Sequence, residues 1–254
     1  MESLSASRLQ AYLACPLKYR FHYVDRVPPP WRPAALAFGG SIHAAIEHFH
    51  KARRDGRAPA VEEILRVFSG DWFAQNLDPL VFGDSDSKES LAEKGQAMLT
   101  LYIEQAGSIQ PRSIEERFEV ELIDPGTGEV FDIRLVGVVD LVEEDGTLVD
   151  LKTGARSMSQ GDVERHLQLS LYALAHFLRM GEIPPLRLDQ LLKTKTPRLE
   201  RYTTTRSIED LSWTAQLAHR VAHAVDDGHF YPNPSWRCTE CEYFAHCQAW
   251  RGRA

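Results

Sequence analysis

Residues 137–152, GVVDLVEEDGTLVDLK, decide how this sequence is interpreted. Two runs of valine and leucine flank the turn Glu144-Asp145-Gly146, which is the pattern of a hairpin. Each run is interrupted by an aspartate, Asp140 in the first and Asp150 in the second, and Lys152 follows the second. Aspartate is depleted in strands. These charges therefore either mark strand ends, with Lys152 as a solvated partner, or perform chemistry.

The sequence on either side extends the hairpin into an α/β unit. Alternation over 115–123 and 129–143, separated by the turn at 124–128, predicts a three-stranded antiparallel meander that ends in 147–152. Apolar residues at helical spacing between Gly161 and Gly181 then predict one amphipathic helix. Two strands and a last helix are predicted at 186–193, 199–205 and 207–227.

The first third of the chain is predicted to be helical. Ser5 or Ser7 would cap a helix that continues to Phe21, and a second helix would begin near Gly39 and run through residue 54. The proline-rich segment 27–33 forbids regular structure between them. Further helices are expected at 60–75 and 88–107. The element order predicts one α/β domain, 1–254, with a mainly helical part (1–110), a sheet-forming part (111–206) and a C-terminal helix with a cysteine segment (207–254).

Composition excludes some classes of protein. The net charge is −7 in 254 residues, which argues against a protein that coats nucleic acid by bulk positive charge. Contacts to phosphate would be local, and Lys193, Lys195, Arg198 and Arg201 are candidates. No apolar run is long enough to span a membrane, and the N-terminus lacks the pattern of a signal peptide. We expect a cytoplasmic protein with no membrane partner.

The four cysteines predict one shared site. Cys238, Cys241 and Cys247 form a C-x2-C-x5-C run, and Cys15 is the only other cysteine. Structural disulfides are rare in the cytosol, and four thiolates hold either zinc or an iron-sulfur cluster, which the spacing does not distinguish. Either group would join the two ends of the chain.

Asp140 and Asp150 have a functional explanation in metal chemistry. Two neighbouring carboxylates repel one another unless a cation lies between them, and Mg²⁺ or Mn²⁺ suits oxygen ligands. Such a cation polarises a phosphate and lowers the pKa of a bound water, and Lys152 beside it would orient or deprotonate that water.

The pattern GVVD-x9-DLK resembles motifs II and III of the PD-(D/E)XK nucleases. The segment 40–47, GSIHAAIE, and the Q-x3-Y pattern of Gln168 and Tyr172 resemble the RecB-type branch. The resemblance implies a restriction-endonuclease-like core, with a mixed central sheet flanked by helices. It also implies the site residues: Asp140, Asp150 and Lys152 as catalytic groups, His43 and the Leu151 carbonyl as further metal ligands, and Gln168 and Tyr172 beside them.

The cysteine arrangement is similar to that of the AddB C-terminal nuclease and of CRISPR-associated iron-sulfur exonucleases. This similarity favours a 4Fe-4S cluster over zinc. It implies a DNA exonuclease acting on single strands or ends; the alternatives are a non-catalytic DNA-binding or assembly module and a restriction-type endonuclease. The sequence lacks G-x4-G-K-[ST], so unwinding would need a helicase or another repair or CRISPR partner.

Two further sets of residues are weaker candidates. Glu116 or Glu119 would add an outer carboxylate to the metal site, although a solvated strand face explains them equally well. Trp31, Tyr231 and Trp236 would stack on unpaired bases, although they are equally suited to the core.

Overall fold

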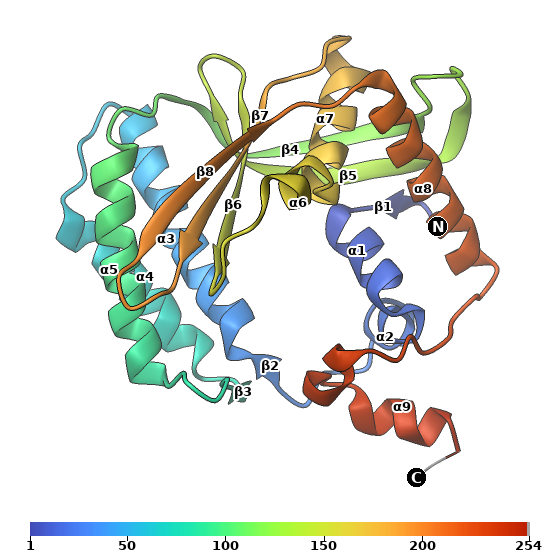
Figure 1. Ribbon diagram of the computed structural model, residues 1–254, viewed down its shortest axis with the longest axis horizontal. Coiled ribbons are helices and arrows are strands. Elements are labelled where there is room, and N and C mark those ends of the chain that lie inside the picture. Colours follow the sequence, from blue (N-terminus) through green and yellow to red (C-terminus); the bar gives the residue numbers. More distant parts are fainter. Residues whose placement is uncertain (253–254) are drawn as a thin grey trace.

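A twisted mixed sheet forms the centre of the computed structural model, which describes residues 1–252 (Figure 1). Its strand order is β1-β5-β6-β7-β8, and β4 pairs with β5. The strands are β1 (Ser3–Leu4), β4 (Pro111–Ile123), β5 (Val130–Glu143), β6 (Leu148–Gly154), β7 (Leu186–Leu192) and β8 (Arg198–Thr204). A separate parallel pair joins β2 (Arg32–Pro33) to β3 (Leu80–Val81).

The predicted meander is present, because β4, β5 and β6 are sequential antiparallel partners. Strand β7 runs parallel to β6, and the connection between them contains two helices, as a parallel crossover requires. Strand β8 returns antiparallel to β7. The fold is therefore the mixed α/β sheet flanked by helices that the sequence predicts.

Helices cover both faces of the sheet (Figure 1). One face packs against α3 (Ala34–Arg54), α4 (Val61–Gln75) and α5 (Lys88–Ala106), and the other against α1 (Ala6–Ala14), α7 (Leu167–Met180) and α8 (Ile208–Asp226). The remaining helical segments are α2 (Pro16–Tyr19), a π-helical turn (Arg20–Val24), α6 (Gln160–Glu164), a 3-10 turn (Trp236–Glu240) and α9 (Phe244–Trp250).

Strand alternation explains this division. On β6, Leu148 packs into the α7 and α8 core, whereas Val149 and Leu151 pack into the α3 to α5 core. Asp150 and Lys152 have the same parity as Leu148. They therefore lie on the face of the sheet that α7 covers, next to the first turn of that helix.

Three predicted helix boundaries were wrong. The first helix does not continue to Phe21, because Cys15 adopts an extended conformation before Pro16 and ends α1. The second helix begins at Ala34, before Gly39. The single helix expected between Gly161 and Gly181 is divided into α6 and α7 by the turn at 165–166, although α7 does end at Gly181, with φ of 78°.

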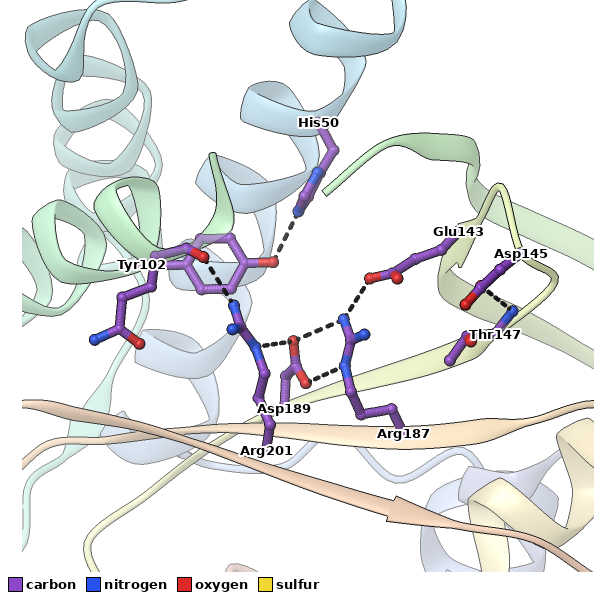
Figure 2. Close-up of polar contacts among 9 residues, drawn as sticks. His50, Tyr102, Glu143, Asp145, Thr147, Arg187, Asp189 and Arg201 are labelled. Atoms are coloured by element: carbon purple, nitrogen blue, oxygen red, sulfur yellow. Dashed lines mark hydrogen bonds and ion pairs between the residues drawn. The ribbon is translucent and has the colours of Figure 1, made fainter. Parts of the chain in front are cut away.

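A buried polar network attaches the helical layer to the sheet (Figure 2). Arg187 on β7 donates to Glu143 at 2.5 Å and to Asp189 at 2.7 Å, and the same aspartate lies 3.5 Å from Arg201 on β8. Arg201 in turn donates to the carbonyl of Gln105 on α5. Burial tends to lower the pKa of Arg187, but hydrogen bonds to Glu143 and Asp189 outweigh it and raise that pKa.

Segments from the two ends of the chain lie side by side (Figure 1). Leu17 N–H donates to the Tyr231 carbonyl at 3.0 Å, Lys18 pairs with Glu242 at 2.9 Å, and the Tyr243 hydroxyl donates to the Val27 carbonyl at 3.0 Å. Among residues 1–252, no helix is both long enough and apolar enough to cross a bilayer.

Candidate active site

Asp140 and Asp150 are neighbours across β5 and β6. Leu141 pairs with Val149, so one further step along the antiparallel register brings Asp140 beside Asp150. An Asp140 oxygen accepts a hydrogen bond from the Leu151 N–H at 2.7 Å. The Asp150 side chain is fully buried and that of Asp140 is 13% exposed, so the pair opens to solvent on the Asp140 side.

Lys152 links this pair to α7. Its ammonium donates to Asp150 Oδ1 at 2.7 Å and to Gln168 Oε1 at 3.0 Å, and Gln168 donates to the Tyr172 hydroxyl at 2.6 Å. Asp150 Oδ2 lies 2.6 Å from the ammonium but has no hydrogen bond of good geometry. This second oxygen therefore lies within the Lys152 ion pair without a regular hydrogen bond.

The packing of Tyr172 depends on Gly137 of β5, through the ring of Phe118 on β4. The ring of Phe118 meets the Tyr172 ring edge to face, with centroids 6.1 Å apart. A Cβ on Gly137 would lie 2.4 Å from Phe118 Cζ, so only glycine leaves room for this ring. The glycine of the GVVD pattern thus supports the tyrosine of the Q-x3-Y pattern.

His43 reaches the pair from α3. Its Nδ1 lies 3.9 Å from an Asp140 oxygen, and its side chain is 31% exposed. Helix α3 lies close to β6: a Cβ on Gly39 would lie only 3.1 Å from the Thr153 hydroxyl. Figure 1 shows α3 on one side of β6 and α7 on the other. The side chains predicted for the nuclease site, His43, Asp140, Asp150, Lys152, Gln168 and Tyr172, therefore form one connected group.

The electrostatics of the site favour a cation. Burial raises the pKa of both Asp140 and Asp150, and the charge of Asp140 raises that of Asp150 further, against the opposing effect of Lys152. Burial and the Lys152 ammonium lower the pKa of His43, which favours the neutral imidazole that binds metals. Throughout residues 1–252, however, no three His, Cys, Asp or Glu side chains are arranged to enclose a metal ion as they stand.

Sequence reasoning missed a third carboxylate, Glu115. It lies on β4 between Ile114 and Glu116, whose partners are Leu141 and Val139, and so lies opposite Asp140. Burial, followed by the charges of Asp140 and Glu47, raises the pKa of Glu115 to about 7. The register of β4 against β5 identifies it, and that register comes from the structure and not from the sequence pattern.

Glu116 and Glu119, the candidates for an outer carboxylate, are engaged in ion pairs, in keeping with the alternative of a solvated strand face. Glu116 accepts from Ser113 and pairs with Arg179, and Glu119 pairs with Arg134 on the outer part of the hairpin. The backbone of the preceding residue, Glu115, is left-handed with φ of 51°. Strict alternation of the strand fails there: Ile114 and Phe118 have the same parity but pack into opposite cores.

The four cysteines line one cavity, together with Leu17, Phe21 and Tyr243. All four are free thiols. Backbone N–H groups of Asn233 and Ser235 donate to Cys15 and Cys238 respectively, each at 3.4 Å. Burial raises the pKa of Cys241 and of Cys247, and the nearby Cys15 adds to both effects. The donor set is suited to a cationic group that stabilises several thiolates at once.

Two of the four basic candidates are engaged inside the protein. Lys193 pairs with Asp86 at 2.5 Å, and Arg201 belongs to the buried network of Figure 2. Arg198 pairs with Glu200 at the surface, and Lys195 is exposed. Of the aromatic candidates, Trp236 is 76% exposed and Tyr231 57% exposed.

The fold and the arrangement of the acidic residues match those expected of a PD-(D/E)XK nuclease, and comparison with known proteins agrees. The model of the PD-(D/E)XK nuclease superfamily matches residues 3–248, so the chain belongs to that superfamily. The Gene 69 proteins of Mycobacterium phages L5 and D29 are each 24% identical to it. The alignment covers 97% of this chain with either protein, 96% of the L5 protein and 97% of the D29 protein.

A solved structure shares the fold. The crystal structure of a "Putative exonuclease" from Eubacterium rectale superposes with a TM-score of 0.59 at 13% identity. The match covers 96% of this chain and 88% of that one.

Proposed function

We propose that this chain is a Mg²⁺- or Mn²⁺-dependent deoxyribonuclease of the RecB-type branch, an exonuclease that acts on single-stranded DNA or on DNA ends. The observation that carries the proposal is the convergence of Asp140, Asp150 and Lys152. Membership of the nuclease superfamily supports phosphodiester hydrolysis as the reaction.

Each residue of the site would have a distinct role. Asp140, Asp150, the Leu151 carbonyl and His43 would hold the divalent ion, and the Asp150 oxygen that lacks a regular hydrogen bond suits that role. When bound, the ion neutralises charge on the scissile phosphate and makes a bound water more acidic. Glu115 would add an outer carboxylate on the open side of Asp140.

Lys152 would position the attacking water and offset charge that develops in the transition state. Its contacts with Asp150 and Gln168 fix the ammonium between the carboxylate pair and α7. Gln168 and Tyr172 would steady the DNA backbone. Exposed Lys195, Arg198 and Trp236 offer phosphate contact and stacking for an unpaired strand.

We also propose that Cys15, Cys238, Cys241 and Cys247 bind a 4Fe-4S cluster, with zinc as the alternative. Their placement around one cavity supports this proposal. The cluster would have a structural role, because it would close a loop of more than 200 residues. Double-stranded substrates would require a helicase or another partner to expose single strands.

The test is cleavage of end-labelled oligonucleotides with Mg²⁺ or Mn²⁺. Asp150→Asn and Lys152→Met should each reduce cleavage by at least about 10³-fold, since each removes a group required in the transition state. The matched control is Glu119→Gln, which alters a half-exposed surface ion pair with Arg134. Full cleavage by the purified variants would reject the catalytic assignment.

Substrate form separates the rival functions. An exonuclease degrades linear single strands and spares circular ones, whereas a restriction-type endonuclease cuts both. A DNA-binding module would retain single strands in a filter assay without cutting either form in the presence of either metal.

A further inference from the structure

Arg206 is a buried cation that the nuclease proposal does not use. It follows the last residues of β8 and is only 5% exposed. Burial lowers the pKa of Arg206. The charges of Asp210 and Glu164 oppose this effect, but neither carboxylate is hydrogen-bonded to the guanidinium. Its guanidinium instead makes five hydrogen bonds to neutral oxygens. A buried charge satisfied in this way requires an explanation.

The five hydrogen bonds join three segments at one point. Nε donates to the Ser170 hydroxyl on α7 at 2.7 Å. Nη2 donates to the carbonyls of Val163 and His166 at 3.1 and 3.3 Å. Nη1 donates to the Thr204 hydroxyl and the Thr205 carbonyl at 2.9 and 2.7 Å. The planar guanidinium therefore ties the end of β8 to the turn between α6 and α7.

This contact lies where the single predicted helix is divided in two. The guanidinium donates to the Val163 carbonyl near the end of α6 and to the carbonyl of His166, which is the N-cap of α7. Arg165 and His166 then leave helical geometry, and α7 starts at Leu167 in a new direction.

The turn that Arg206 holds carries part of the active site. Gln168 lies two residues after His166 and accepts from Lys152 at 3.0 Å. The Nδ1 atom of His166 is buried without a hydrogen-bond partner, and the imidazole is close enough to Asp150 and Lys152 to interact with their charges. A shift of this turn would move the group that fixes the Lys152 ammonium.

We infer that Arg206 is a positioning residue of the nuclease site: it fixes the turn at 165–166 so that Gln168 holds Lys152 against Asp150. This inference rests on the proposed nuclease function. Arginine is required because lysine has no planar fork with which to bind all three segments at once.

The test combines steady-state kinetics with a double-mutant cycle. Arg206→Lys, which keeps the charge, should lower kcat by about 10- to 100-fold, as expected for a displacement near 1 Å, and change KM for a single-stranded oligonucleotide by less than about 3-fold. Arg134→Met, in an exposed ion pair, is the control and should leave both constants unchanged.

In the cycle, Arg206→Lys should have little additional effect on kcat in the Gln168→Ala background, because both substitutions free the Lys152 ammonium from Gln168. Fully additive effects, or a lowered melting temperature with unchanged kcat, would overturn the inference. Ser170→Ala removes one of the five contacts and should give a smaller kcat loss in the same direction if Arg206→Lys does not fold.

Hydrogen exchange tests the positioning role of Arg206 without an activity assay. Amides of residues 164–172 should exchange at least about 10-fold faster in Arg206→Lys than in the wild type, and those of β4 should not. If the wild-type protein cuts no DNA, the nuclease proposal fails, while the exchange result still decides the role of Arg206. Unchanged exchange in this peptide would overturn that role.

Discussion

Replacing Asp189 with asparagine isolates the charge at the centre of the buried network. Asp189 is fully buried and contacts Arg187 at 2.7 Å and Arg201 at 3.5 Å (Figure 2). Asparagine keeps the shape of the side chain but leaves two guanidinium groups facing an uncharged amide. Removing one partner of a buried ion pair costs about 3–5 kcal/mol, because the other charge remains buried.

The structure places the expected cost at the lower end of that range. Arg187 keeps Glu143 as a partner, and Arg201 is 34% exposed. We therefore expect the free energy of unfolding to fall by about 3 kcal/mol. For a protein of this size the melting temperature should fall by roughly 6–12 °C.

The assay is urea denaturation at pH 7, followed by far-ultraviolet circular dichroism and analysed only where the transition is two-state. Glu119→Gln is the matched control, because its ion pair with Arg134 is about half exposed and should contribute no more than about 1 kcal/mol. A loss below about 1 kcal/mol for Asp189→Asn would refute the reasoning. Asp189→Leu combined with Arg187→Met should cost less than the sum of the two single changes.

Three further predictions concern other parts of the molecule. Burial, together with Arg53 and Arg187, lowers the pKa of His50 to about 3, so the unfolded chain takes up a proton near pH 6.5 before the folded protein does. Stability is therefore complete above pH 6.5 and falls as the pH drops toward 3. His50 contributes a loss of about 2 kcal/mol between pH 7 and 5, and an identical pH slope in His50→Gln would contradict this. Cys15→Ala should lower the melting temperature about as much as Cys241→Ala, and melting of Cys15→Ala at the wild-type temperature would exclude a shared site. Protein purified without oxygen should be brown and contain iron, whereas colourless protein with stoichiometric zinc would favour zinc.

Local patterns were enough to predict the centre of the fold. The hairpin of residues 137–152 and the alternation before it gave the meander, since side-chain period and turn chemistry are local properties. The convergence of Asp140, Asp150 and Lys152 followed from that register. His43 and Gln168 were placed by resemblance, because no local rule brings two separate helices to one strand.

The errors arose where distant residues override local preference. Alternation failed at Glu115, whose left-handed backbone turns a carboxylate toward Asp140. Helical periodicity continued through His166, but the helix is divided at 165–166, where Arg206, 40 residues later, donates to the His166 carbonyl. Lys193 appeared free in the sequence, and its partner Asp86 lies 107 positions away. Such pairings depend on the completed tertiary structure.

Binding of Mn²⁺ to the purified protein, measured by electron paramagnetic resonance with Mg²⁺ as competitor, tests the central claim most directly. If Asp140 and Asp150 share a divalent ion, the wild type binds Mn²⁺ in competition with Mg²⁺, and Asp140→Asn and Asp150→Asn each weaken that binding by at least about 10-fold. Glu119→Gln should bind as the wild type does. Equal Mn²⁺ affinity in the wild type and both aspartate variants would contradict the account.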